Sequence, residues 1–399
     1  METNSTNKRS IELYLVCFLS NISYYPIMVQ NGLGRKIAIA VWVILGITLI
    51  SKKIRFGDST IYTIYMALFV LFCINTYIVG TINDVEFYNN HFFQPVIIAS
   101  LVFFVSNILG YEISKEDLKK ICIAYFYSMA IISIPLFIFY LRGTDLSSSV
   151  YEYRYGKNEI SVLIFCALVI SLTIYQPKGF IQKLIRIIAI AFFVIDEIFL
   201  RARSVLLCLG LLICILIFCN NTINKRARFI SIASVFVILL VFYFNPNVYR
   251  NFISQIVYAG RDANSISDLS SGRSDTIITG IEIFLENPLF GVGKRGTIDC
   301  FYVSILASDG LLGLPGIIMA LMPFVWSIRN LKNHSDVDLC FFSIAASLFL
   351  ISILEELAPF GPGTRCYILW LMWGILLVNN QGSGLKQEAA QKLSRYIRS

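Results

Sequence analysis

The chain has 399 residues, of which 57% are hydrophobic and 15% are charged, and its mean hydropathy is +0.71. A soluble domain of this length could not bury so much apolar surface, so the composition excludes a soluble protein and predicts that lipid surrounds most of the chain. The net charge of +8 does not indicate a nucleic-acid-binding face, because the basic residues stand between apolar segments and do not cluster.

Twelve apolar segments follow one another along the chain and predict an all-α polytopic integral membrane protein with about 12 transmembrane helices. They cover residues 11–30, 36–51, 59–80, 93–111, 120–141, 159–175, 184–200, 204–219, 228–244, 300–327, 338–354 and 366–380. We expect residues 1–399 to form a single polytopic membrane domain without a separate soluble part.

The basic residues between these segments set the expected orientation. With the N-terminus inside, 20 of the 33 Lys and Arg residues fall on the inner side. This excess agrees with the positive-inside rule and predicts that both termini are cytoplasmic. Residues 245–299 then form one long external loop.

Six arginines lie on the external side, where the same rule disfavours them. They are Arg142, Arg154, Arg201, Arg203, Arg273 and Arg365. One interpretation is that their side chains reach the lipid headgroups. The other is that several of them bind an anionic ligand, because charged groups at membrane depth commonly mark functional sites.

Two acidic residues lie inside the apolar segment that precedes Arg201. Glu197 stands four residues before Arg201, so an ion pair along one helix face is available to them, and Asp196 is its neighbour. The pair is either structural or holds the external arginines in position for an anion.

The long external loop contains an expected amphipathic helix. Residues 271–275 predict a turn with an N-cap, and Ile277, Ile281, Phe284 and Leu285 then form one apolar stripe. Pro288 ends this helix within the run Glu286-Asn287-Pro288-Leu289-Phe290-Gly291-Val292-Gly293. The glycines either let backbone approach a ligand or shape a turn.

Arg273, the helix after it, residues 286–293 and a later aromatic helix with Gly310 and Gly313 together resemble the O-antigen polymerase and ligase superfamily. The turn over residues 201–206 is similar to an arginine-serine turn of that family, and residues 155–160 are similar to its entry into a middle span. The resemblance implies a GT-C-like glycosyltransferase of the bacterial inner membrane, with its site facing the periplasm. It also implies glycan donors on undecaprenyl diphosphate and a reaction without metal or cofactor.

Asp299 stands eleven residues before Gly310, where the ligases of this family carry a histidine. The aspartate favours a polymerase that joins lipid-linked repeat units into an O-antigen or capsule. Alternatives are an O-antigen ligase and a lipid-linked oligosaccharide flippase. A transporter commonly shows two related halves, and none are visible here.

The resemblance also implies roles for individual residues. The six external arginines are expected to bind the substrate diphosphate, because a guanidinium pairs with phosphate and stays protonated. Asp299 and Arg273 are the expected catalytic residues, with Asp299 as proton acceptor, as helix cap, or both. Glu282, Glu286, Glu355 and Glu356 are further carboxylates near the external side. Expected partners are a flippase and a chain-length regulator in the membrane. No metal-ligand spacing is visible among the ten cysteines and two histidines.

Overall fold

A computed structural model of the chain describes residues 2–50, 59–143, 157–200, 202–219, 245, 272–293, 298–331 and 335–380. Every regular element within these residues is a helix, which confirms the all-α prediction for the described part. The segment 228–244, expected as a ninth span, lies outside the described residues.

The helices follow the expected apolar segments closely. In the first half they are α1 (Glu2–Ile22), α2 (Pro26–Gln30), α3 (Leu33–Ile50), α4 (Thr60–Ile82), η1 (Phe87–Asn89), α5 (Phe93–Leu109), α6 (Lys115–Gly143) and α7 (Lys157–Thr173). They continue with α8 (Phe180–Leu200), α9 (Arg203–Cys219), α13 (Arg273–Glu286), α14 (Phe301–Asp309), η3 (Gly310–Gly313), α15 (Leu314–Asn330) and α16 (Asp336–Leu354). A C-terminal helix covers Tyr367–Asn380.

Two expected spans are divided in the structure. The segment 11–30 forms α1 and α2, because the chain turns before Pro26, which begins α2. The segment 300–327 forms α14 and α15 with η3 between them. At the divide Gly310 adopts φ +61°, a conformation that an α-helix does not contain.

Four stretches are long and apolar enough to cross a membrane: Thr60–Ile82, Lys115–Ile138, Phe301–Asn330 and Asp336–Leu354. Five further apolar helices have 10–17 residues, fewer than the roughly 20 that a full crossing needs. The chain therefore has the helices of a multi-pass membrane protein. The total of about twelve crossings and the cytoplasmic termini stay predictions.

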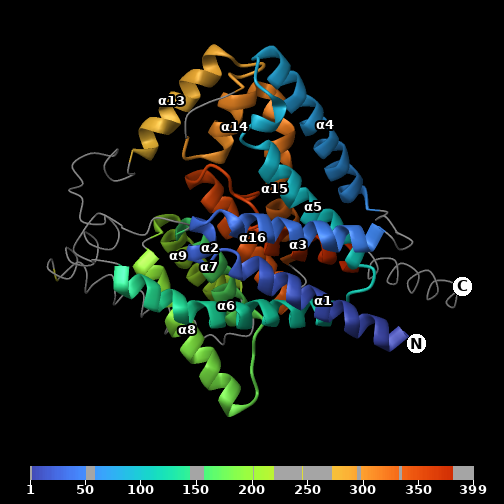
Figure 1. Ribbon diagram of the computed structural model, residues 1–399, viewed down its shortest axis with the longest axis vertical. Coiled ribbons are helices and arrows are strands. Elements are labelled where there is room, and N and C mark those ends of the chain that lie inside the picture. The colour runs from blue at the N-terminus through green and yellow to red at the C-terminus, as the bar shows by residue number, and fades with distance from the viewer. Residues whose placement is uncertain are drawn as a thin grey trace, which may run out of the picture.

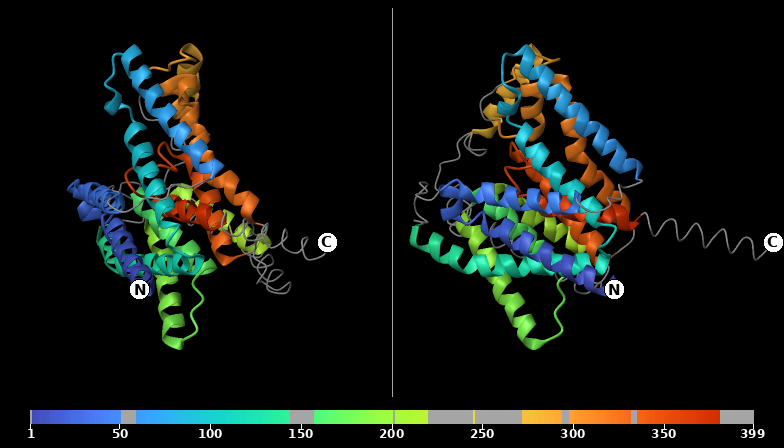
Figure 2. Two further views of the ribbon diagram at one scale, coloured as in Figure 1. Left: turned by 90° about the vertical axis from the view of Figure 1, so that its right-hand side faces the viewer. Right: turned by 45° about the vertical axis from the view of Figure 1, so that its right-hand side comes forward.

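The helices form two groups that cross at a steep angle. In Figures 1 and 2, α1, α3 and α6 lie together, and α4, α5, α14 and α15 stand beside them as a second group. α7 and the C-terminal helix fill the centre, since residues 159–170 and 367–378 are buried on every face. Apolar side chains on the outside of α4 and α8 remain exposed, as expected for surfaces that face lipid.

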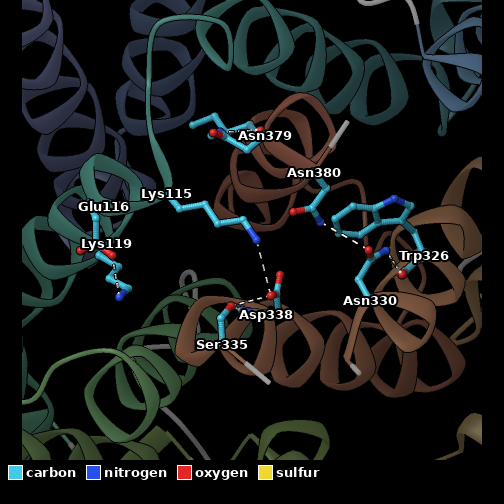
Figure 3. Close-up of polar contacts among 10 residues, drawn as sticks. Lys115, Glu116, Lys119, Trp326, Asn330, Ser335, Asp338, Asn379 and Asn380 are labelled. Carbon is cyan, nitrogen blue, oxygen red and sulfur yellow. Dashed lines mark hydrogen bonds and ion pairs between the residues drawn. The ribbon is translucent and has the colours of Figure 1, made fainter. Parts of the chain in front are cut away.

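Polar contacts connect the ends of several helices (Figure 3). Lys115 Nζ at the start of α6 lies 3.6 Å from Asp338 Oδ2 at the start of α16. Asn380 Nδ2 donates to Asn330 Oδ1 at the end of α15 over 3.4 Å. Of these helices, α6 and α16 begin here, and α15 and the C-terminal helix end here.

The C-terminal helix packs close to α5 at Gly374, where a Cβ atom would lie 2.7 Å from Ser106 Cβ and 2.8 Å from the Phe103 carbonyl oxygen. We expect Gly374→Ala to force the two helices apart and to cost about 1–3 kcal/mol. The check is the melting temperature of the detergent-solubilised protein, which should fall. Gly210→Ala is the matched control, since a Cβ there meets nothing within 4 Å. Equal melting temperatures for the two variants would contradict this packing.

Candidate functional site

The end of α16 is the point where the external residues singled out in the sequence meet. The helix stops at Leu354, and Glu355 adopts an extended backbone with φ −140°. The segment from Glu355 to Cys366 that joins α16 to the C-terminal helix is largely buried. Side chains from α9, α13 and α14, and from the connection between α4 and α5, converge on it.

A buried ion pair fixes this segment. Arg365 Nη1 lies 2.9 Å from Glu355 Oε2, and the two side chains are 3% and 8% exposed. Ser204 Oγ at the start of α9 donates to Glu355 Oε1 over 2.6 Å. Burial is the largest single influence on the pKa of Arg365 and lowers it, but Glu355, Cys366 and Glu159 together outweigh burial and the pKa is raised. Arg365 therefore stays charged and joins its loop to α9 through Glu355.

A second ion pair lies behind the first. Arg35 of α3 pairs with Glu159 in the first turn of α7, and the charge of Glu159 also acts on Arg365. Tyr24, after α1, accepts a hydrogen bond from the Thr364 backbone N–H at 2.6 Å. The sequence did not single out Arg35 or Glu159 as site residues. Each stands at the edge of an expected span, and a charged residue at such an edge is only weak evidence of a site.

Arg273 and Asp299 lie on the other side of the α16 end. Arg273 Nη1, at the start of α13, donates to the Leu354 carbonyl oxygen over 2.6 Å. The Asp299 backbone N–H donates to Thr276 Oγ1, one turn along α13, at 3.4 Å. Burial raises the pKa of Asp299; Arg273 opposes the rise, and Glu356 and Glu355 add to it.

Glu356 has partners of its own. Its Oε2 lies 3.1 Å from His91 Nε2, and its Oε1 accepts from Ser304 Oγ of α14 at 3.5 Å. Apart from an external position, nothing in the sequence indicated that Glu356 or His91 belongs to the site. Their meeting depends on how the helices pack, which the sequence does not show.

The structure thus brings together four of the seven residues proposed for the site. Arg203 begins α9 next to Ser204, and Arg273, Asp299 and Arg365 surround the end of α16. Arg154 and Arg201 lie outside the described residues. Arg142 is in the last turn of α6, and its side chain is not described.

The acidic residues of α8 have serine partners. Ser133 of α6 donates to Asp196, and Ser161 of α7 donates to Glu197. Both carboxylates are fully buried. They join α8 to its two neighbours, which is a structural role. The expected pairing of Glu197 with Arg201 stays a prediction, because Arg201 is not described.

The glycine-rich run after α13 serves to fold the backbone. A Cβ at Gly291, whose φ is +60°, would lie 2.3 Å from the Ser308 carbonyl oxygen, and one at Gly310 would lie 2.5 Å from the backbone of Leu289. The Gly293 N–H donates to the Ser308 carbonyl oxygen at 2.8 Å. Of the two sequence interpretations, the structure supports the turn: these glycines let residues 288–293 cross the end of α14.

The helix α13 begins three residues earlier than the expected Thr276. Its N-cap is Gly272, whose φ is +78° and whose lack of a side chain means that no side-chain cap forms. Gly280 packs against α14, where a Cβ would lie 2.7 Å from Val303 Cγ1. α13 therefore lies on α14 and carries Arg273 to the end of α16.

Residues 187–310 match the family model for O-antigen ligase. This match supports the resemblance of the chain to the O-antigen polymerase and ligase superfamily. The match includes α9, α13 and α14, and so takes in Arg203, Arg273 and Asp299. It does not separate the polymerases of the superfamily from its ligases. No curated protein matches the chain.

The match over residues 187–310, together with the apolar helices, indicates a multi-pass membrane protein that resembles a membrane glycosyltransferase. Within the described residues, no three His, Cys, Asp or Glu side chains gather in a way that could hold a metal ion.

The ion pair at the α16 end predicts a non-additive effect on folding. Arg365→Met leaves Glu355 buried without its cation and should cost about 3–5 kcal/mol. The double variant Arg365→Met/Glu355→Met removes both charges and should recover much of this loss. The measurement is the yield of folded, monodisperse protein together with its melting temperature. If the double variant is no better folded than Arg365→Met, the pair is not what fixes this loop.

Proposed function

We propose that the chain is a polysaccharide polymerase that joins undecaprenyl-diphosphate-linked repeat units on the periplasmic side of the inner membrane. The observation that carries the proposal is the meeting of Arg273 with Asp299 at the end of α16, inside the stretch that matches the superfamily. An aspartate at position 299, where the ligases carry histidine, favours polymerisation over transfer to a lipid A core.

The proposed reaction needs positive charge more than it needs an acid. The C1–oxygen bond between the sugar and the diphosphate breaks as an acceptor hydroxyl forms a new bond to C1, and the diphosphate leaves as a stabilised anion. Arginine suits this leaving group because its planar guanidinium can bind two phosphate oxygens at once. Within the described residues, one guanidinium N–H of Arg273 is bonded to the Leu354 carbonyl, which orients the group.

The acceptor hydroxyl must also lose its proton. Among the carboxylates at the α16 end, Glu355 is paired with Arg365 and Glu356 with His91. Asp299 is half-buried, and its raised pKa makes it a better proton acceptor than an ordinary aspartate. We therefore assign proton acceptance to Asp299 and diphosphate binding to Arg273 and Arg203. Arg365 is held inside its ion pair and acts by fixing the loop.

Arg273→Ala and Arg203→Ala should each lower polymerisation about 100-fold or more, because charge on the departing diphosphate is no longer stabilised. The measurement is the length distribution of surface polysaccharide on a gel after the variant gene replaces the native one. Protein level and membrane insertion should be unchanged. Arg329→Ala is the control: Arg329 is exposed at the opposite end of α15 and its loss should have no effect. Normal polymer from both site variants would remove the proposed diphosphate site.

Asp299→Asn should abolish polymerisation if the carboxylate accepts the proton. The N-cap residue of α14 is Cys300, and no side-chain cap hydrogen bond forms there, so the expected capping role of Asp299 is wrong and the variant tests its carboxylate alone. The activity of the wild-type protein should rise with pH as Asp299 ionises, with a midpoint above the ordinary aspartate pKa, since burial and two glutamates raise it. Unchanged activity of Asp299→Asn would rule out this carboxylate as the proton acceptor.

Deletion of the gene distinguishes the alternative functions. A surface anchor that carries a single repeat unit would support the polymerase, because export and ligation still operate. Long polymer that stays unattached would instead indicate a ligase. Complete loss of surface glycan, with lipid-linked repeat units retained inside, would indicate a flippase.

A further inference from the structure

A pocket at the end of α4 has no part in the reaction described above. Its volume is about 290 Å³, at the lower end of the roughly 300–1,000 Å³ that is typical of ligand-binding pockets. The lining includes the rings of Tyr77 and Phe87 and the carboxylates of Asp84 and Glu86. Apolar rings beside a few polar groups are the usual composition of a site for a small molecule or a sugar.

The backbone around this pocket forms a closed turn. The Val85 N–H donates to the Gly80 carbonyl oxygen at 2.8 Å, and a Cβ at Gly80 would lie 2.6 Å from the Val85 carbonyl oxygen. Asp84 adopts φ +52° and is, among the described residues, the one non-glycine residue with a positive φ. The Phe87 and Tyr77 rings have centroids 6.1 Å apart. The turn thus holds rings and carboxylates side by side.

The charge of the pocket indicates what it does not bind. Within the described part of the chain, neither Asp84 nor Glu86 forms an ion pair. Glu86 Oε2 accepts a hydrogen bond from Asn89 Nδ2 at 2.9 Å. Carboxylates without a cation repel phosphate, so this pocket does not suit the diphosphate or an anionic lipid headgroup.

The rings favour a sugar over lipid as the occupant. Tyr77 is 61% exposed and Phe87 is 39% exposed. Exposed aromatic rings at the end of a span can also anchor it at the membrane surface, but that role leaves the two carboxylates unexplained. A sugar uses both kinds of group, because its C–H face packs on a ring and its hydroxyls donate strong hydrogen bonds to carboxylates.

The pocket adjoins the candidate site but lies away from its arginine. α4 and α13 end at the same end of the molecule (Figure 1), and a Cβ at Gly293, after α13, would lie 2.7 Å from Asn83 Cβ. Arg273 is at the other end of α13, which has 14 residues and is therefore about 20 Å long. An oligosaccharide whose reacting end lies beside Arg273 thus reaches the pocket with a distant sugar.

On the basis of the polymerase function proposed above, we infer that this pocket is a glycan subsite. Tyr77 and Phe87 pack against a sugar of the lipid-linked oligosaccharide that is remote from the reacting C1 atom, and Asp84 and Glu86 accept hydrogen bonds from its hydroxyls. The subsite holds the oligosaccharide and touches no reacting atom. Its loss weakens the binding of substrate and transition state equally, so KM rises and kcat stays nearly unchanged.

The test is the rate of polymerisation by the purified protein in vesicles at increasing concentrations of lipid-linked repeat units, extracted from a host that lacks the gene. Tyr77→Ala removes one wall of the subsite and should raise KM about 10-fold, with kcat lowered less than about threefold. Asp84→Asn/Glu86→Gln should raise KM by a similar factor, because neutral amides accept weaker hydrogen bonds. Asparagine tolerates the positive φ of position 84, so this variant is expected to fold.

Ile74→Ala is the matched control for the loss of an exposed side chain from α4. Ile74 is 51% exposed and lies about one turn before Tyr77 on the same helix, but it does not line the pocket. KM should be unchanged in this variant. Tyr77→Phe keeps the ring and should also keep a near-normal KM.

Two results would overturn the inference alone, with a wild-type protein that polymerises the repeat units. If KM is unchanged in both Tyr77→Ala and the double variant, no sugar occupies the pocket. If Tyr77→Ala raises KM and the double variant does not, the ring contacts the lipid part of the substrate. A wild-type protein that forms no polymer from these units, under conditions where an established polymerase does, would overturn the proposed function and this subsite with it.

Discussion

The arrangement of the site depends on the buried ion pair between Arg365 and Glu355. Two charges are costly to bury, and such a pair persists only when its geometry is good and its remaining polar atoms find partners. Here Ser204 supplies one such partner. Since the pair fixes the chain directly after α16, it also determines where Leu354 and Glu356 lie. Arg273 donates a hydrogen bond to the Leu354 carbonyl oxygen, and His91 contacts the Glu356 carboxylate.

The pairing of charges around this point has a chemical consequence. A site that must attract a diphosphate loses that ability if every arginine is neutralised by a carboxylate. In the described structure Glu355 pairs with Arg365, and Glu159 pairs with Arg35. Glu356 contacts His91. Arg273 is instead bonded to a backbone carbonyl. The charge of Arg273 also acts on Asp299.

The sequence predicted the helices well and the site only in part. Apolar runs mark helices because lipid requires them, so even the short C-terminal helix was found. Composition could not show that residues 300–327 divide at Gly310, because the break depends on one backbone conformation. Arg273 and Asp299 were found through the resemblance to the superfamily, in which Asp299 stands eleven residues before Gly310. Glu356 was one of four external carboxylates that the sequence could not tell apart, and only the packing of distant helices shows that His91 and Arg35 lie near the site.

The glycines that carry the family resemblance determine how the backbone folds at this place. Gly291 and Gly310 lie where two backbone segments cross, and a side chain at either would collide with the other segment. These residues therefore specify a scaffold, one that places Asp299 at the start of α14 and next to α13. The same scaffold could present another side chain at position 299 with little change in packing, because Asp299 is only half-buried and contacts Thr276 through its backbone. The groups whose charges act on this position are Arg273, Glu356 and Glu355, so the acid–base character of the site depends on the side chain at position 299 and on these three neighbours.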